Sequence, residues 1–257
     1  MLALTPCYSA CMNDMKNDMN RHEAGGRQAT TQERAVKRTE ALEQLAERIL
    51  LLTPPHPLRV AVDGIDAAGK TTLANDLALV LQAQGHTVIR ASIDGFHRPR
   101  AERYQRGPAS AEGYYLDSFD HSALREKLLL PLGPNGSRRY RRAIFDFRTD
   151  AALTTTEEVA PVDAALIFDG VFLLRPELDA LWEYRIFVDV PFAVALRRAM
   201  ERDLALFGSA EAVQARYQER YIPGQQLYFE RVAPHKRADA LVGNATPESP
   251  RLRFPHA

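Results

Sequence analysis

The chain of 257 residues has little cysteine, no long apolar run and no excess of charge of either sign. Its two cysteines, Cys7 and Cys11, lie in a polar N-terminal stretch, which argues against a structural disulfide or metal site and fits a reducing cytoplasm. The sequence lacks a run of eighteen apolar residues, so it predicts no membrane span. The 33 basic residues balance the 33 acidic ones, so the charge indicates neither a nucleic-acid nor a membrane-surface partner.

Apolar residues make up 46% of the chain, which is enough for the core of one α/β domain. Residues 1–32 mix polar residues, glycine and methionine without a period, and we expect a disordered tail there whose role and true start stay open. We place the folded domain at 33–245, with a helical lid at about 197–231 and a C-terminal tail at 246–257.

The most informative stretch runs from Val60 to Thr72 and reads as an apolar strand, a glycine-bounded loop and the start of a helix. It matches the phosphate-binding pattern G-x-x-x-x-G-K-[ST], in which loop N–H groups and the helix N-terminus bind phosphate. Lys70 is expected to reach the β- and γ-phosphates, and the Thr71 hydroxyl to ligate Mg²⁺. The alternative is an ordinary glycine-rich turn. The predicted nucleotide-binding residues are Gly64, Ile65, Asp66, Ala67, Ala68, Gly69, Lys70, Thr71 and Thr72.

Predicted strands and helices alternate along the chain. The strands are Leu58–Val62, Thr87–Ile93, Ala164–Phe168, Tyr184–Val190 and Ala240–Val242. The helices are 33–52, Lys70–Ala83, Ser122–Leu130 and Phe192–Ala205. This rhythm predicts a mainly parallel sheet covered on both faces, a three-layer α/β/α P-loop fold. Ligands bind such sheets at the carboxyl ends of the strands, so polar residues that follow strands are candidates for the site.

Three aspartates follow predicted strands. Asp169 follows the apolar run 164–168, where a Walker B carboxylate holds Mg²⁺ directly or through water. Asp94 follows the second predicted strand, and we assign it as the base that receives the proton of an acceptor hydroxyl. A turn role before the glycine that follows each is the alternative. Asp63 adjoins the phosphate loop, where a negative charge would repel phosphate, so we interpret it as structural.

Arginines at helical spacing predict a lid. Arg198 and Arg202 stand four residues apart and share a helix face, from which they would neutralise charge that develops during phosphoryl transfer. The alternative is a solvated face paired with nearby acids. Arg216 and Arg220 repeat the spacing before the break at Pro223. Such a helical pair would close over ATP and exclude water.

These segments together resemble the uridine kinase, phosphoribulokinase and pantothenate kinase family of P-loop kinases, and the uridine kinase-like proteins most. Besides the P-loop, the likeness rests on Ser92–His97, Tyr114–Asp120, Phe168–Phe172 and Tyr217–Tyr228. It implies ATP and Mg²⁺ as cofactors and a carboxylate near an aromatic ring that meets the ribose hydroxyls. On the acceptor side it implies Phe96, His97, Tyr115, Asp117, Phe145 and Arg148, with core packing as the alternative for the aromatic rings.

The chain departs from the uridine kinase pattern in two places. Phe145 stands where those kinases carry a tyrosine, and the histidine that follows in them is absent. The Arg-Gly-Arg step of their lid is replaced by Phe207-Gly208-Ser209. When a nucleobase-binding site loses a polar partner, it discriminates less among nucleobases, so the identity of the acceptor stays open.

We therefore predict transfer of the γ-phosphoryl group of MgATP to an alcohol, with a nucleoside 5′-hydroxyl as the first candidate. Pantothenate or another small alcohol is the alternative within kinases. A P-loop ATPase or a nucleotide-binding regulator is the alternative of another class. We expect a nucleotide and a small molecule as partners, and leave homo-oligomerisation open.

Overall fold

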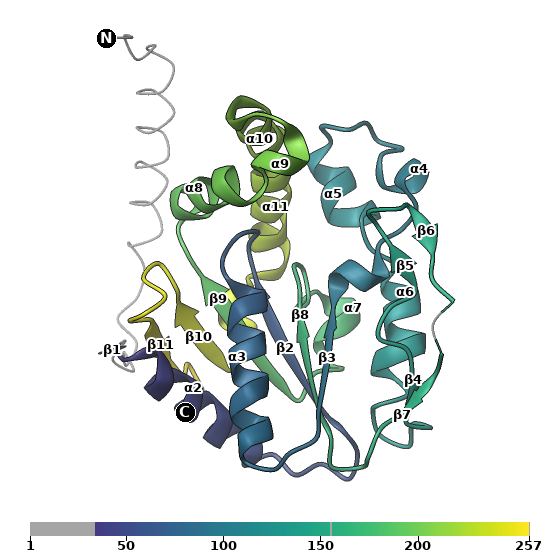
Figure 1. Ribbon diagram of the computed structural model, residues 1–257, viewed down its shortest axis with the longest axis vertical. Coiled ribbons are helices and arrows are strands. Elements are labelled where there is room, and N and C mark those ends of the chain that lie inside the picture. The colour runs from purple at the N-terminus through teal and green to yellow at the C-terminus, as the bar shows by residue number, and fades with distance from the viewer. Residues whose placement is uncertain (1–33, 155, 257) are drawn as a thin grey trace. The chain divides into compact units, whose positions relative to one another are not determined.

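The computed structural model describes residues 34–154 and 156–256, which form one unit around a seven-stranded sheet (Figure 1). The strand order is β1-β11-β10-β9-β2-β8-β3. The strands are β1 (Arg34–Ala35), β2 (Leu58–Gly64), β3 (Val88–Ser92), β8 (Ala165–Asp169), β9 (Tyr184–Asp189), β10 (Ala240–Gly243) and β11 (Arg251–Arg253). The predictions at 1–32 lie outside the described residues.

The sheet is mainly parallel, as predicted. Strands β3, β8, β2, β9 and β10 pair in parallel, and each of the five predicted strands is present. Strand β11 runs antiparallel to β10, and β1 runs antiparallel to β11. The prediction of a C-terminal tail at 246–257 was therefore wrong, because Arg251–Arg253 extends the sheet.

Short helices and hairpins complete the unit. The α-helices are α2 (Arg38–Leu50), α3 (Lys70–Ala83), α4 (Arg100–Arg103), α5 (Ala111–Asp117), α6 (His121–Leu124), α7 (Pro176–Asp179), α8 (Phe192–Arg202), α9 (Leu204–Phe207), α10 (Ala210–Arg216), α11 (Ile222–Val232) and α12 (Pro234–Arg237). A 3₁₀ turn, η1 (Ile93–Phe96), and two π-helical turns, η2 (Arg125–Leu129) and η3 (Tyr217–Tyr221), join them. Two small sheets pair β4 (Arg139–Tyr140) with β7 (Glu158–Val159) and β5 (Phe145–Asp146) with β6 (Ala151–Ala152).

Side chains of each central strand alternate between two apolar cores, one on each face of the sheet. In β2, Val60 and Val62 pack with α2 and α3, whereas Ala61 faces the opposite core with α5, α6 and α11. Apolar runs buried on both faces are what a covered parallel sheet requires. The three-layer α/β/α P-loop fold is thus confirmed. Within the described residues no helix is long and apolar enough to cross a membrane.

Two predicted helices differ in their course. The helix predicted at 33–52 begins at Arg38, and the one predicted at Phe192–Ala205 breaks at Asp203. The Asp203 carboxylate there accepts hydrogen bonds from Arg202 and from the Tyr217 hydroxyl, so it turns the chain into the next lid helix. Helices α8 to α11 stand over the end of the sheet at which β2 leads into α3 (Figure 1).

Candidate active site

The phosphate loop between β2 and α3 is shaped by two glycines. Gly64 has φ +152° and lies so close to β9 that a Cβ atom there would overlap the Val188 carbonyl oxygen. Gly69 has φ +91°, and a Cβ atom there would lie 2.6 Å from the Asn244 side-chain nitrogen. Backbone in this conformation and at this distance requires glycine. The loop therefore keeps the tight curve that lets backbone N–H groups converge on phosphate.

Lys70 opens helix α3 and is buried at the centre of the loop. Its Nζ donates a hydrogen bond to the Ile65 carbonyl at 2.6 Å. Burial lowers the pKa of Lys70, whereas Asp66, Asp63 and Asp169 raise it and so favour the charged ammonium. An ammonium inside the curve of the loop is suited to a phosphate charge.

Asp169 lies at the carboxyl end of β8, in register with Val62 of β2 on one side and Ser92 of β3 on the other. Its Oδ2 accepts a hydrogen bond from Thr71 Oγ1 at 2.6 Å, and its Oδ1 accepts one from Arg90 Nη2 at 2.7 Å. The partner Arg90 was not among the predicted residues, because its position within a strand gives no sign of this contact.

The Thr71 hydroxyl and the Asp169 carboxylate are oxygen ligands of the kind that Mg²⁺ prefers. No group of three or more histidine, cysteine or acidic side chains in the described part of the chain could hold a metal. This donor set fits an ion that takes its remaining ligands from nucleotide phosphates and water, as Mg²⁺ in nucleotide sites does.

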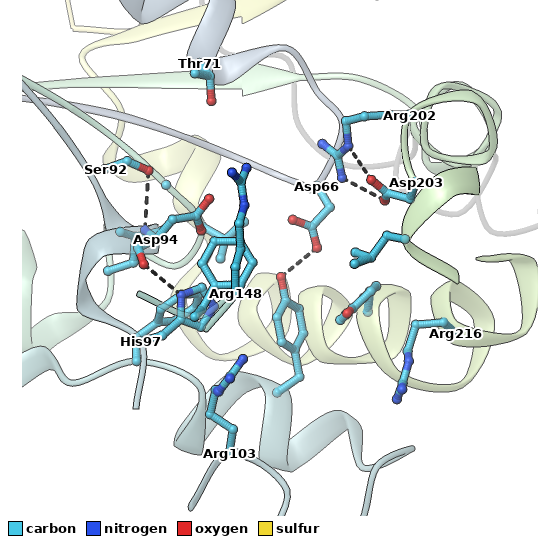
Figure 2. A pocket seen from close by; sticks show the side chains of 18 of the residues that line it. Asp66, Thr71, Ser92, Asp94, His97, Arg103, Arg148, Arg202, Asp203 and Arg216 are labelled. Atoms are coloured by element: carbon cyan, nitrogen blue, oxygen red, sulfur yellow. Dashed lines mark hydrogen bonds and ion pairs between the residues drawn. The ribbon is translucent and has the colours of Figure 1, made fainter. Parts of the chain in front are cut away.

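A cavity of about 990 Å³ opens over these groups, between the strand ends and the lid. It is lined by side chains of the phosphate loop, of the strand ends and of the lid (Figure 2). The predicted residues that line it are Asp66, Lys70, Thr71, Asp94, His97, Arg148, Asp169 and Arg202. The structure thus brings the phosphate loop, both key aspartates and the lid arginine Arg202 to one cavity, which Arg216 also lines.

Asp94 lies in η1, directly after β3 ends at Ser92. Its backbone N–H donates to Ser92 Oγ, but its carboxylate accepts no hydrogen bond from a residue that the structure describes. Burial raises the pKa of Asp94 to about 6, and the negative charges of Asp66 and Asp169 add to the shift. A carboxylate that lines a cavity and has no donor among the described residues is able to accept the proton of a bound hydroxyl.

The His97 ring lies between two aromatic rings, 4.6 Å from the Phe119 centroid and 4.8 Å from that of Phe147. Its Nδ1 is 3.0 Å from the Asp94 carbonyl oxygen. Burial lowers the pKa of His97 to about 4, so the ring is neutral near pH 7. The two phenylalanines also line the cavity and were not among the predicted residues.

Four predicted acceptor-side residues do not line the cavity, and these predictions need correction. Phe96 is fully buried against Phe168, and Phe145 is buried in β5. The Asp117 carboxylate accepts a hydrogen bond from Arg106 Nε at 2.8 Å.

Tyr115 is buried, with the Arg175 guanidinium 4.6 Å from its ring centroid. Successive residues of helix α5 face different directions, so its neighbour Tyr114 lines the cavity instead.

The Tyr114 hydroxyl donates a 2.6 Å hydrogen bond to the Asp66 carboxylate in the phosphate loop. Gln225 of α11 binds the same residue twice, accepting from Asp66 N at 2.9 Å and donating to its Oδ2 at 3.1 Å. The phosphate loop is thereby joined to α5 and to the last lid helix. The residues Tyr114 and Gln225 were missed in these roles because the contact joins segments far apart in the sequence.

Arg198 also needs correction. Its guanidinium donates to the carbonyl oxygens of Asn244 at 2.8 Å and Ala245 at 3.1 Å, and it does not line the cavity. It therefore braces the loop after β10. Arg202, one helical turn later, lines the cavity and donates to Asp203 at 2.7 Å. The two arginines share a helix face, but only the end of α8 reaches the cavity.

The other two lid arginines, Arg216 and Arg220, also lie in different surroundings. Arg220 is 2% exposed and donates to the Ser110 carbonyl at 2.8 Å, which makes it part of the packing between lid and α5. Arg216 lines the cavity and donates to the Pro108 carbonyl.

Asp63 has the structural surroundings that we predicted. Its carboxylate accepts hydrogen bonds from the Tyr228 hydroxyl and from Gly64 N, the latter at 2.8 Å. Complete burial raises the pKa of Asp63 to about 6. The carboxylate joins the end of β2 to lid helix α11.

No family model matches the chain. Uridine-cytidine kinase B of Dictyostelium discoideum is 28% identical to it over 193 residues, which cover 73% of this chain and 74% of that protein. Among solved structures, one described as a possible uridine kinase of Bacillus stearothermophilus has a TM-score of 0.62 and 25% identity. The match covers 79% of this chain and 97% of that one.

A kinase of Silicibacter sp. TM1040, provisionally assigned to a fructose transport system, is also similar, with a TM-score of 0.63 and 27% identity. That match covers 74% of this chain and 95% of the other. These similarities agree with the fold and with the phosphate loop. They identify the chain as a relative of the uridine kinases within the P-loop kinases, a phosphotransferase that acts on an alcohol group.

Proposed function

We propose that the chain transfers the γ-phosphoryl group of MgATP to a hydroxyl group of a small alcohol. The observation that carries this proposal is the Asp94 carboxylate, which has no hydrogen-bond donor among the described residues and shares one cavity with Lys70 and the Thr71–Asp169 pair. A nucleotide-binding switch needs no such carboxylate beside its phosphates. The arrangement therefore favours a kinase over an ATPase or a regulator.

ATP is the donor substrate, and the loop from Gly64 to Thr72 would bind its phosphates. Lys70 supplies positive charge at the β- and γ-phosphates, and Thr71 with Asp169 would hold Mg²⁺, which neutralises charge on the phosphates when bound. Phosphoryl transfer depends chiefly on positioning and on charge stabilisation, so these groups contribute more than any covalent step.

On the acceptor side, Asp94 would orient the hydroxyl and take its proton as the new P–O bond forms. Arg202 lies on the lid side of the same cavity and would stabilise the charge that develops on the transferred group. Closure of the lid over these groups would exclude water, which limits hydrolysis of ATP without an acceptor.

A nucleoside 5′-hydroxyl is the first acceptor to consider, since the relatives with 25–28% identity are described as uridine or uridine-cytidine kinases. The similarity to a kinase assigned to a fructose transport system supports sugars as a second class. Pantothenate completes the set, because the segment after β3 resembles that of pantothenate kinases.

The test is ATP consumption by the purified protein with uridine, cytidine, fructose and pantothenate, each compared with a reaction that lacks an acceptor. We expect at least one acceptor to raise ADP formation well above the background and to yield a phosphorylated product. Lys70→Ala should abolish this activity, whereas Lys127→Ala, an exposed lysine outside the cavity, should retain it. Hydrolysis at the same rate with and without every acceptor would favour the ATPase.

A further inference from the structure

The cavity is rich in arginine. Its lining includes Arg100, Arg103, Arg148, Arg202 and Arg216. Two of these have a carboxylate partner: Arg103 lies 3.1 Å from Asp150, and Arg202 lies 2.7 Å from Asp203. The other three form no ion pair with any residue that the structure describes. The lining thus holds more positive charge than its own ion pairs neutralise.

Arg148 is an exposed residue of this lining. Its guanidinium forms no hydrogen bond within the described chain, and its nearest aromatic neighbour is the Phe147 ring at 5.7 Å. Its backbone is held in place, because Arg148 N donates to Asp146 Oδ1 at 2.9 Å. Figure 2 shows the side chain beside Asp94 and His97, with Arg202 across the cavity. A positioned backbone therefore carries an unpaired guanidinium into the cavity.

Arg103 provides a second, independent observation. The residue is only 8% exposed, and its Nε is buried without a hydrogen-bond partner although one Nη donates to Asp150. The Arg103 side chain lines the cavity, and its other Nη, which forms no hydrogen bond with a described residue, is able to donate to a ligand oxygen there. A guanidinium so placed favours an oxygen-rich, negatively charged group.

Backbone contacts place these two arginines on the acceptor side. Ile144 N donates to the Gly95 carbonyl at 2.8 Å, so the segment that leads to Arg148 is docked on the 3₁₀ turn that carries Asp94. Asp150, two residues after Arg148, accepts from Arg100 N and from Arg103. These contacts join both arginines to the turn that carries Asp94, the predicted base, so we assign them to the acceptor rather than to ATP.

We infer that the acceptor of this kinase carries an anionic group, a carboxylate or a phosphate ester, which Arg148 and Arg103 bind while Asp94 receives the hydroxyl. The planar guanidinium fork matches the geometry of both anions. The inference rests on the proposed function and narrows its substrate class. An uncharged nucleoside or sugar would leave the guanidinium groups of Arg148 and Arg103 without an anion to bind, and we expect it to be a poor acceptor.

The test uses acceptor pairs that differ in one anionic group: pantothenate and pantothenyl alcohol, glycerate and glycerol, orotidine and uridine, ribulose 5-phosphate and ribulose. At least one charged member should show a kcat/KM at least about tenfold above its uncharged partner, because a hydrogen bond to a charged group contributes that much or more. The first three pairs report on a carboxylate, and the last reports on a phosphate ester.

Arg148→Gln should lower kcat/KM for the preferred charged acceptor by at least about tenfold, mainly through its KM. The KM for ATP and the rate with the uncharged partner should not change. Arg139→Gln removes an exposed arginine outside the cavity and should leave all these values at the wild-type level. An equal loss for both members of a pair, or a raised KM for ATP, would overturn the inference.

Calorimetric titration of the charged members into protein saturated with ADP and Mg²⁺ separates this inference from the proposed function. Suppose that a charged compound binds, that Arg148→Gln weakens this binding, and that no acceptor is phosphorylated. This result would contradict the proposed function but not the inference. Phosphorylation of uridine or ribulose at rates equal to their charged partners would contradict the inference alone. If no charged member binds, the inference is also overturned.

Discussion

Asp63 and Asp94 have the same shift in pKa but different surroundings. Burial raises the pKa of each to about 6. The Asp63 carboxylate accepts hydrogen bonds from Tyr228 and Gly64, which hold it as a link between β2 and the lid. The Asp94 carboxylate faces the cavity and has no such donor in the described part of the chain. At the scale of single residues, the hydrogen-bond partners of a carboxylate decide its role more than its pKa does.

Asp94→Asn should lower kcat by about 10²–10⁴-fold, because general-base assistance is lost while the shape of the side chain stays. In the wild type, kcat/KM for the acceptor should decrease as the pH is lowered through about 6, because the base takes a proton there. Burial raises the pKa of Asp94 to about 6, and the charges of Asp66 and Asp169 add to the shift. Steady-state rates across this range, with ATP saturation measured separately, provide the check.

Asp163→Asn, an exposed aspartate outside the cavity, is the matched control and should keep both the rate and its dependence on pH. Full turnover in Asp94→Asn with unchanged pH dependence would exclude Asp94 as the base.

The phosphate loop is the element in which local backbone and distant contacts coincide. Gly69 caps α3 in the left-handed region and also lies against Asn244, which follows β10. The Asn244 side chain donates to the Ala68 carbonyl at 2.7 Å, and Arg198 donates to the Asn244 carbonyl. The loop is therefore shaped by its own glycines and braced by the segment after the last parallel strand.

Gly69→Ala and Gly85→Ala form a matched pair, since their φ values are +91° and +88°. A Cβ atom at Gly85 meets nothing within 4 Å, whereas one at Gly69 would displace Asn244. We expect each to lose about 1–2 kcal/mol of unfolding free energy from the left-handed backbone. Gly69→Ala alone should lose more unfolding free energy than this, and it alone should raise the KM for ATP.

Urea unfolding and ATP titration of the two variants check this expectation. Equal losses of stability with unchanged ATP affinity in both would show that the contact between Gly69 and Asn244 is unimportant.

At the scale of the whole molecule, the segment expected to be a tail supplies a strand of the sheet, β11, between β10 and β1. Leu252 of β11 is 5% exposed, pairs in register with Val242 and belongs to the core shared with α2 and α3. Phe254 beyond it lies 3.7 Å from the Arg48 guanidinium. The chain end is thus part of the folded unit and supports β10, the strand whose following loop braces the phosphate loop.

Leu252→Ala should reduce the free energy of unfolding by about 2–5 kcal/mol, the usual range when a buried leucine is truncated. Arg253→Ala, next to it on the exposed side of the strand, should change stability by no more than about 0.5 kcal/mol. Thermal or urea unfolding of the two variants measures the difference. Equal stability of the two would mean that the strand contributes little to the core.

Much of this molecule follows from short-range patterns in the sequence. The apolar runs at Leu58–Val62 and Ala164–Phe168 predict buried parallel strands, because only a sheet covered on both faces buries every side chain of such a run. The phosphate loop is predicted as well, since its glycines, lysine and threonine are adjacent in the chain. Asp94 and Asp169 were found because each directly follows a strand.

What only the tertiary structure decided is which side chains from distant segments share the cavity. Tyr114 rather than Tyr115 meets the phosphate loop, because the packing of α5 selects one direction among neighbouring residues. Arg202 rather than Arg198 reaches the cavity, because only the end of α8 extends to it. The sequence by itself determined a P-loop phosphotransferase fold. The tertiary structure decided which arginines line the cavity, since Arg103 and Arg148 are brought to it only by contacts between segments that no local pattern encodes.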